Sequence, residues 1–281
     1  MATVVMRLAR NMDLHLDGEP YGLDTFQVEM RRRLWWHICL LDLWCSEDQG
    51  TDSEVLNIPF DTKIPLNIND GDIVQGSNLP VTDRTGITEM TFASIRYESI
   101  AAIRRMKQNL DSSPCTLNNN CQCKSKWAEA VQSLSQRVWS EYISHCSPID
   151  PASRLYIGLA KTVPKISFVI HQPVFGPALV DLNTLDWIFL AAVEAVEFCR
   201  FIDSFPVTAK WNWYFRQSSS RWYLLTFLLT ELCVRPPCPS VERAWIAVNS
   251  VYREWGLMGS KSEWQTVFKL MQRAQALRTG A

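Results

Sequence analysis

The stretch EMRRRLWWHICLLD, residues 29–42, constrains the fold more than any other part of the chain. Three consecutive arginines run into two tryptophans, and an acidic residue follows two turns later. Apolar residues recur at helical spacing from Phe26 to Cys45, so the pattern predicts a long helix that ends near residue 47. Asp24 and Gln27 resemble a capping box at its start. The motif residues are Glu29, Arg31, Arg32, Arg33, Trp35, Trp36 and Asp42.

The spacing within this motif predicts specific side-chain contacts. Glu29 precedes Arg33 by four residues, which favours an ion pair within the helix. Arg31 and Arg32 precede the tryptophans by four residues, which favours cation–π contacts. The motif also suits a buried Arg–Asp pair between elements. Two interpretations remain open, phosphate or DNA contact and a scaffold that fixes the helix. Tryptophans interleaved with aliphatic residues favour the scaffold.

The rest of the chain predicts an all-α fold, a multi-helix bundle forming a single domain over residues 1–281. The first helical pattern lacks a capped start, so we expect upstream sequence to complete the domain. Prolines predict an irregular crossover near residues 50–87 and a kink at Pro164. A polar loop is expected near residues 111–125. Further helices are expected near 4–12, 88–110, 127–142, then up to 171, and near 184–204, 208–234, 240–256 and 262–278.

Composition limits the classes of protein to which this chain can belong. Hydrophobic residues make up 47% of the chain and charged residues 20%, which is typical of an ordered globular protein. The net charge of −1 lacks the basic excess of a domain that grips nucleic acid. No apolar run approaches the roughly 20 residues of a membrane span. Nine cysteines, an odd number placed partly in apolar helices, indicate free thiols in the cytosol or nucleus.

Metal binding and catalysis find little support. Cys115, Cys121 and Cys123 lie together in the polar loop but lack a fourth nearby ligand for structural zinc. No hydrolase, metalloprotease, phosphate-binding or dinucleotide-binding motif is present. We therefore expect no metal, no cofactor and no catalytic residues in this chain.

Aromatic residues are dense in the last third of the chain. Two interpretations remain open, an apolar ligand pocket and aromatic packing within a bundle. The residues proposed to line a ligand pocket are Trp211, Trp213, Trp222 and Tyr223.

The motif EMRRRLWWHICLLD resembles the signature of the fungal-specific transcription factor regulatory domain, the middle homology region of fungal binuclear zinc-cluster transcription factors. The resemblance is collinear over nearly the whole chain. It includes RLARNMDLHLDGE, IPFDTKIPLNIND, RTGITEMTF and the closing helices. Two departures occur at the end of the first helix. Asp13 stands where the family usually has a glycine that caps the helix, and Leu16 stands where it often has arginine.

The resemblance implies a nuclear, all-α regulatory domain that controls transcription. Its partners would be the transcription machinery or the factor's own DNA-binding region, with a hydrophobic small molecule as a candidate effector. DNA would be bound only through an N-terminal zinc cluster, which is not in this sequence. A homodimer is left open.

Two other hypotheses compete with a regulator. A repurposed enzyme or small-molecule binder of secondary metabolism would use the aromatic cavity, with His37, Asp42 or Glu231 transferring protons. A structural fragment would expose apolar surface and aggregate or oligomerise. The collinear resemblance favours the regulator.

Overall fold

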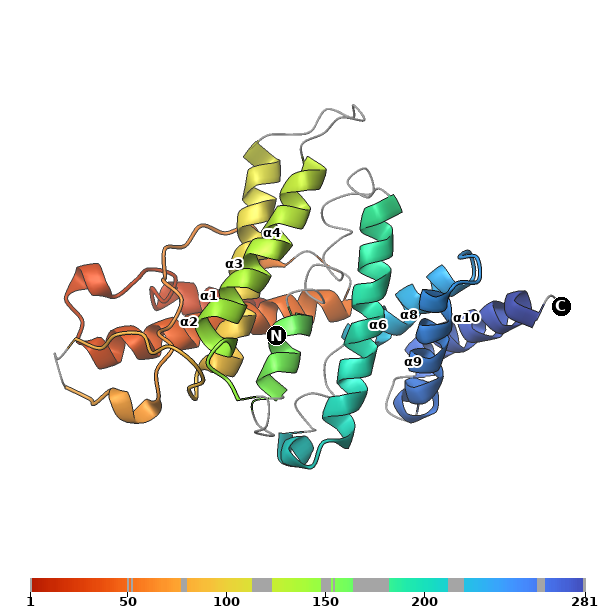
Figure 1. Ribbon diagram of the computed structural model, residues 1–281. Helices are drawn as coiled ribbons and strands as arrows, with labels where there is room; N and C mark the ends of the chain where they lie inside the picture. Colours follow the sequence, from red (N-terminus) through yellow and green to blue (C-terminus); the bar gives the residue numbers. More distant parts are fainter. Residues whose placement is uncertain are drawn as a thin grey trace. The chain divides into compact units, whose positions relative to one another are not determined.

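The computed structural model describes residues 2–49, 51, 53–76, 80–112, 123–147, 153, 155–163, 182–211, 220–256 and 261–279. Every regular element within these ranges is a helix (Figure 1), which confirms the predicted all-α class. The chain divides into two compact units, Met1–Ser167 and Phe168–Ala281. Each unit is described by itself below, and the single domain over 1–281 stays a prediction.

Unit 1 is a set of packed helices at the predicted places. They are α1 (Ala2–Asn11), α2 (Thr25–Gln49), α3 (Thr91–Ser112) and α4 (Cys123–Val138), followed by a π-helical turn (Trp139–Ile143). α2 packs against α1 and α3, and α3 packs against α4. Residues 155–163 are also helical, whereas Pro164 and its predicted kink lie outside the described residues. Trp35, Ile95, Ile100 and Ile103 are among the fully buried side chains of this core.

Local hydrogen bonds explain where α1 ends. Asp13 adopts a left-handed backbone with φ of 55°. Its N–H donates to the Arg10 carbonyl and the N–H of Leu14 donates to the Ala9 carbonyl, both at 3.0 Å. This pair of bonds is a Schellman cap, in which glycine usually takes the left-handed position. The aspartate therefore adopts the capping conformation expected of the family's glycine.

A capping side chain also explains where α2 begins. Asp24 Oδ1 accepts a hydrogen bond of 2.7 Å from the backbone N–H of Gln27. This bond satisfies one of the amide groups that have no partner within the helix. The half of the predicted capping box that Asp24 supplies is therefore confirmed.

An irregular crossover links α2 to α3, as predicted. Its described residues, 51, 53–76 and 80–90, contain only two short 3₁₀ turns, η2 (Glu54–Leu56) and η3 (Asp70–Asp72). Side chains rather than a regular ladder must therefore fix this segment on the helices.

Unit 2 contains α6 (Leu182–Ser204), η6 (Pro206–Trp211), α8 (Ser220–Leu232), α9 (Pro239–Gly256) and α10 (Lys261–Thr279). α6 packs against α8 and α9, and α10 packs against α8. The predicted α-helix over 208–234 is wrong at its start, because residues 206–211 form a 3₁₀ turn. The hydroxyl of Thr208 donates to the carbonyls of Ile202 and Phe205, which holds the chain in a tight turn after α6. Residues 212–219 lie outside the described residues.

Candidate functional site

Arg32 forms the buried ion pair at the centre of the motif. Its Nε and Nη2 donate to the two carboxylate oxygens of Asp17, each at 2.7 Å. Only 8% of the Arg32 side chain and 4% of the Asp17 side chain are exposed. Nη2 also lies 2.9 Å from Glu19 Oε2. The predicted Arg–Asp pair between elements is therefore confirmed, with Asp17 as the partner.

Asp17 joins α2 to the crossover. Besides Arg32, its carboxylate accepts the backbone N–H groups of Lys63 at 3.0 Å and Glu19 at 3.2 Å. Its own N–H donates to Asp61 Oδ1 at 2.8 Å. Burial alone would raise the pKa of Asp17, but the hydrogen bonds from Arg32, Lys63 and Glu19 outweigh it and lower the pKa to about 2.

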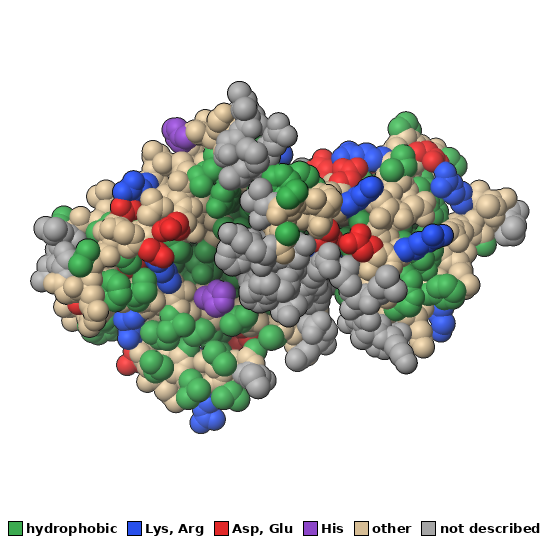
Figure 2. Space-filling view, turned by 90° about the horizontal axis from the view of Figure 1, so that it is seen from below, with side chains coloured by type: hydrophobic (Ala, Val, Ile, Leu, Met, Phe, Trp, Pro, Cys, Tyr) green, Lys and Arg blue, Asp and Glu red, His purple; other side chains and the backbone are tan. Residues whose placement is uncertain are grey.

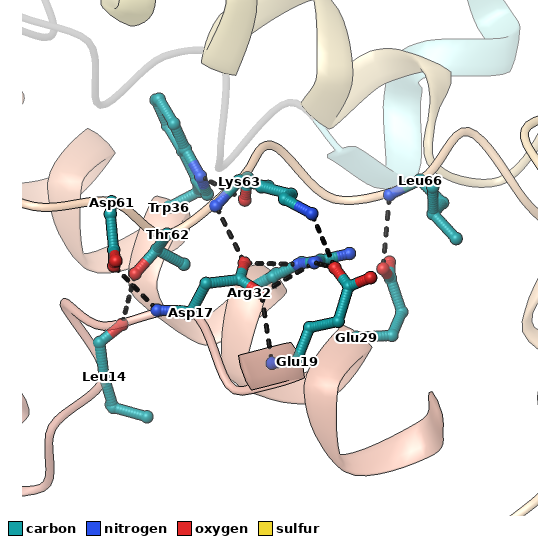
Figure 3. A network of polar contacts seen from close by, with 10 residues as sticks. All are labelled: Leu14, Asp17, Glu19, Glu29, Arg32, Trp36, Asp61, Thr62, Lys63 and Leu66. Carbon is teal, nitrogen blue, oxygen red and sulfur yellow. Dashed lines mark hydrogen bonds and ion pairs between the residues drawn. The ribbon is translucent and has the colours of Figure 1, made fainter. Parts of the chain in front are cut away.

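Four further contacts attach the crossover around Asp17 (Figure 3). Trp36 Nε1 donates to the Lys63 carbonyl at 2.9 Å, and Lys63 Nζ pairs with Glu19 at 2.6 Å. The Thr62 hydroxyl donates to the Leu14 carbonyl at 2.8 Å. The backbone N–H of Leu66 donates to Glu29 Oε2 at 3.2 Å. We call this set the crossover lock; its residues are Leu14, Asp17, Glu19, Glu29, Arg32, Trp36, Asp61, Thr62, Lys63 and Leu66.

The other two arginines of the motif are also engaged inside the chain. Arg33 Nε pairs with Glu29 at 2.9 Å, which confirms the predicted ion pair, and Nη1 reaches Asp70 at 2.6 Å. Arg31 Nη2 donates to the carbonyls of Met12 at 2.9 Å and Asp13 at 2.7 Å. These carbonyls follow the end of α1, where a cation is favourable.

The predicted cation–π contacts of Arg31 and Arg32 are wrong. Within the described part of the chain neither guanidinium lies over Trp35 or Trp36, because carbonyl and carboxylate oxygens hold both groups. Phe60 of the crossover packs against the two indoles instead, at ring distances of 5.2 and 5.6 Å.

Asp42 supports the crossover at a second point. Its Oδ2 accepts the Ser53 hydroxyl at 2.7 Å and the backbone N–H of Val55 at 3.0 Å. The carboxylate is buried and orders the start of η2. The motif residue farthest along α2 thus contacts the same irregular segment as the crossover lock.

The proposed pocket residues are only partly described. Trp222 packs edge-on against Trp264 at 6.0 Å, and Tyr252 lies 4.5 Å from the same ring. Tyr223 is half-buried, and burial raises its pKa. The side chain of Trp211 and the whole of Trp213 lie outside the described residues. A ligand pocket here stays a prediction.

Of the residues proposed for proton transfer, two bind partners within the chain and the third faces solvent. Asp42 binds the crossover, and Glu231 pairs with Arg235 at 2.7 Å. His37 lies on the solvent-facing side of α2. Partial desolvation of its ring and the charge of Arg96 both lower its pKa. These positions give no specific support to an enzyme.

The described ranges offer no candidate site for a metal ion. These contain no group of three His, Cys, Asp or Glu side chains that could hold a metal ion. Cys115 and Cys121, and the side chain of Cys123, lie outside them. None of the described helices is both long enough and apolar enough to span a membrane.

A second buried Arg–Asp–Trp cluster lies in unit 2 and was missed by the sequence analysis. Arg221 donates to both carboxylate oxygens of Asp203, at 2.7 and 2.9 Å, and its guanidinium lies 5.0 Å from the Trp255 ring. Trp255 Nε1 donates to Asp203 at 3.3 Å. An arginine directly before the apolar run of α8 was the available signal, since a buried arginine requires a partner.

Comparison with known proteins identifies the family. The Fungal specific transcription factor domain matches residues 1–147, which include the motif and the crossover lock. The chain belongs to this family. The predicted resemblance is therefore confirmed.

Similar curated proteins are named as transcription factors. The Pyriculol/pyriculariol biosynthesis cluster transcription factor 1 of Pyricularia oryzae is 28% identical over 262 residues, covering 88% of this chain and 34% of the relative. The C6 finger domain transcription factor hasF of Aspergillus fumigatus is 26% identical, covering 75% and 31%. The Aurofusarin cluster transcription factor aurR2 of Gibberella zeae is 24% identical, covering 88% and 37%. The chain thus spans about a third of the length of these relatives. No solved structure matches significantly.

Proposed function

We propose that this chain is the regulatory region of a fungal zinc-cluster transcription factor and makes no sequence-specific DNA contact itself. One observation supports the proposed absence of sequence-specific DNA contact. All three arginines of the most basic stretch bind carboxylates or backbone carbonyls of the same chain. Phosphate contact would require these groups to give up their partners within the chain, which for Arg32 and Arg33 include the buried carboxylates of Asp17 and Glu29. The net charge of −1 supplies no general attraction to DNA in their place.

The relatives suggest the genes under control and the place of action. Two of them are named for the biosynthetic clusters whose transcription they serve. By analogy, this chain would act in the nucleus on a biosynthetic gene cluster. Its partners would be proteins of the transcription machinery or a DNA-binding region of the same factor, and a hydrophobic small molecule remains the proposed effector. The names of the relatives do not favour the enzyme alternative.

A tethering experiment tests this function. The 281-residue chain is fused to a heterologous DNA-binding domain and expressed beside a reporter that carries the matching site. We expect reporter output to rise or fall relative to the DNA-binding domain alone. The untethered chain should leave output unchanged and should bind genomic DNA fragments without sequence preference. Tight sequence-specific binding by the untethered chain, or an inert fusion, would contradict the proposal.

A further inference from the structure

The outer face of α1 is apolar and uncovered within the described residues. Val4, Leu8 and Met12 recur every four residues and are 59%, 56% and 60% exposed. Met6 and Ala9, on the neighbouring side of the same helix, are buried. A surface helix usually buries its only apolar stripe. α1 therefore carries a second apolar stripe that no described residue covers.

α2 extends this surface. Leu34 and Leu41 are 47% and 38% exposed and lie two turns apart on one side of the helix. Arg31, one turn before Leu34, reaches the carbonyl of Met12, so the stripe of α2 runs beside the Met12 end of α1. Figure 2 shows hydrophobic side chains gathered on part of the surface of unit 1. We define the α1–α2 apolar face as Val4, Val5, Leu8, Met12, Leu34 and Leu41.

The spacing and charge of this face indicate its occupant. Side chains that repeat every four or seven residues on two packed helices suit a third helix laid along them. Arg7 and Arg10 are exposed on α1 and form no ion pair with any residue that the structure describes. Arg7 directly precedes Leu8 at the edge of the stripe, so an acidic side chain on the incoming helix would complement it. Arg10 points to another side of α1, because residues two apart on a helix do not face the same way. The α1 helix of a second copy, Ala2–Asn11, contains no acidic residue that could complement an arginine of this face.

We propose that the α1–α2 apolar face binds an amphipathic helix of a partner protein whose apolar stripe is flanked by Asp and Glu. Leucine-like side chains would fill the positions between the two helices, and the acidic flank would meet Arg7. This binding site goes beyond the proposed function and does not depend on it.

Two fluorescent peptides test the face. Both have about three heptads, with leucine at the apolar positions, and they differ only in having Glu or Lys on the flanks. We expect the full chain to bind the Glu peptide at least about tenfold more tightly than the Lys peptide in fluorescence anisotropy at low salt. The difference should shrink as salt rises.

Surface variants test whether the peptide binds at the α1–α2 apolar face. The double variant Leu8→Ser with Leu34→Ser should weaken Glu-peptide binding by at least about tenfold while its circular dichroism is unchanged. Ile246→Ser is the matched control, because Ile246 is 69% exposed on α9 in unit 2, and it should have no effect. The variant Arg7→Glu should prefer the Lys peptide.

Three results would overturn the proposal. The first is equal affinity for the two peptides, or binding to neither. The second is unchanged binding in the Leu8→Ser, Leu34→Ser variant. The third is a dimer in sedimentation that this variant dissociates, because a second copy would then occupy the face.

Discussion

Asn67 shows how one buried side chain holds irregular backbone in place. Its Nδ2 donates to the carbonyls of Arg84 at 2.7 Å and Gly86 at 2.9 Å. Its Oδ1 accepts the hydroxyls of Thr88 at 2.7 Å and Thr91 at 3.1 Å. The residue is 4% exposed, so these partners have little access to water. Asn67 thereby joins the crossover to the start of α3.

Replacing Asn67 should therefore destabilise unit 1. We expect Asn67→Ala to lower the free energy of unfolding by about 2–4 kcal/mol, because buried carbonyls and hydroxyls lose their partners. Urea denaturation followed by tryptophan fluorescence measures the change. Asn249→Ala, at an exposed position of α9, is the control and should change stability by less than about 0.5 kcal/mol. Equal effects of the two substitutions would contradict this role of Asn67.

For Asp13 we expect the opposite effect, a gain in stability when the residue is replaced. Its φ of 55° is a conformation that glycine adopts without strain, and its carboxylate lies at the unfavourable end of the α1 dipole. Asp13→Gly should stabilise the chain by about 0.5–1 kcal/mol in thermal or urea unfolding. Asp13→Asn separates the causes, since it removes the charge and tolerates the same backbone. A loss of stability in Asp13→Gly would show that the aspartate makes a favourable contact in this cap.

The two residues differ in how far the sequence could predict them. The departure at Asp13 was visible because the resemblance places a glycine there. The Glu29–Arg33 pair followed from helical spacing, which is a local rule. Asn67 gave no signal, because its side-chain partners lie 17 to 24 residues away in a segment without periodicity.

At the scale of elements, the crossover lock should make the stability of unit 1 depend on acid pH. The folded pKa of Asp17 is about 2, below the ordinary value of 3.8. The stabilisation is therefore fully present above about pH 4 and is lost as pH falls through about 2. A shift of this size is worth about 2 kcal/mol. Urea unfolding at a series of pH values should show this decline.

Asp17→Asn is the variant that assigns the decline to this carboxylate. It should flatten the part of the pH profile between about 4 and 2 that depends on Asp17. At neutral pH it should destabilise the chain by about 3–5 kcal/mol, because Arg32 keeps its buried charge but loses its main counter-ion. Identical acid slopes in the variant and the parent chain would exclude Asp17 as the source.

The contact between α9 and α10 depends on a glycine. A Cβ atom built at Gly256 would lie 2.5 Å from the Trp264 ring, which is too close for any real contact. Gly256→Ala should therefore destabilise unit 2 by about 1–3 kcal/mol in urea unfolding. Combining it with Trp264→Leu should cost less than the sum of the single changes, because the smaller side chain makes room. Strict additivity would contradict the steric cause.

Elements with strong periodicity could be predicted, whereas their junctions could not. The apolar spacing of α2, α3, α6 and α9 placed these helices to within a few residues. The start of the predicted 208–234 helix failed because Thr208 bonds to the carbonyls at the end of α6, a side-chain effect that periodicity does not register. The crossover was predicted as irregular, but its anchoring by Asp17, Asp42 and Asn67 required coordinates.

At the scale of the whole molecule, a buried arginine has a similar structural role in each unit. Arg32 with Asp17 fixes irregular chain in unit 1, and Arg221 with Asp203 fixes α8 to the end of α6 in unit 2. Composition predicted a globular protein and helical periodicity predicted an all-α fold, but neither could assign these pairs. The α1–α2 apolar face has the opposite character, because its apolar side chains are exposed beside Arg7, which forms no ion pair with any residue that the structure describes. That contrast separates residues of the scaffold from residues available to a partner.

The cysteines allow a prediction about the folded chain as a whole. Cys39 is buried on α2 and Cys199 is half-buried on α6, and burial raises the pKa of both thiols, that of Cys199 to about 11. Cys238 is exposed before α9, and its hydrogen bonds with Ser240 and the backbone N–H of Val241 lower its pKa. The thiolate is the reactive form of cysteine. The exposure of Cys238 and its lowered pKa should therefore both make it react faster than Cys39 and Cys199.

We therefore expect iodoacetamide to label Cys238 at least about tenfold faster than Cys39 or Cys199 in the folded chain. Peptide mass spectrometry over a time course measures the three rates. As pH falls from 8.5 to 7, the Cys238 rate should fall less steeply than that of free cysteine, because its lowered pKa keeps more thiolate at neutral pH. In urea the three rates should converge, since burial and the helix are then lost. Equal rates in the folded chain would show that Cys39 and Cys199 are not protected by the packing described for α2 and α6.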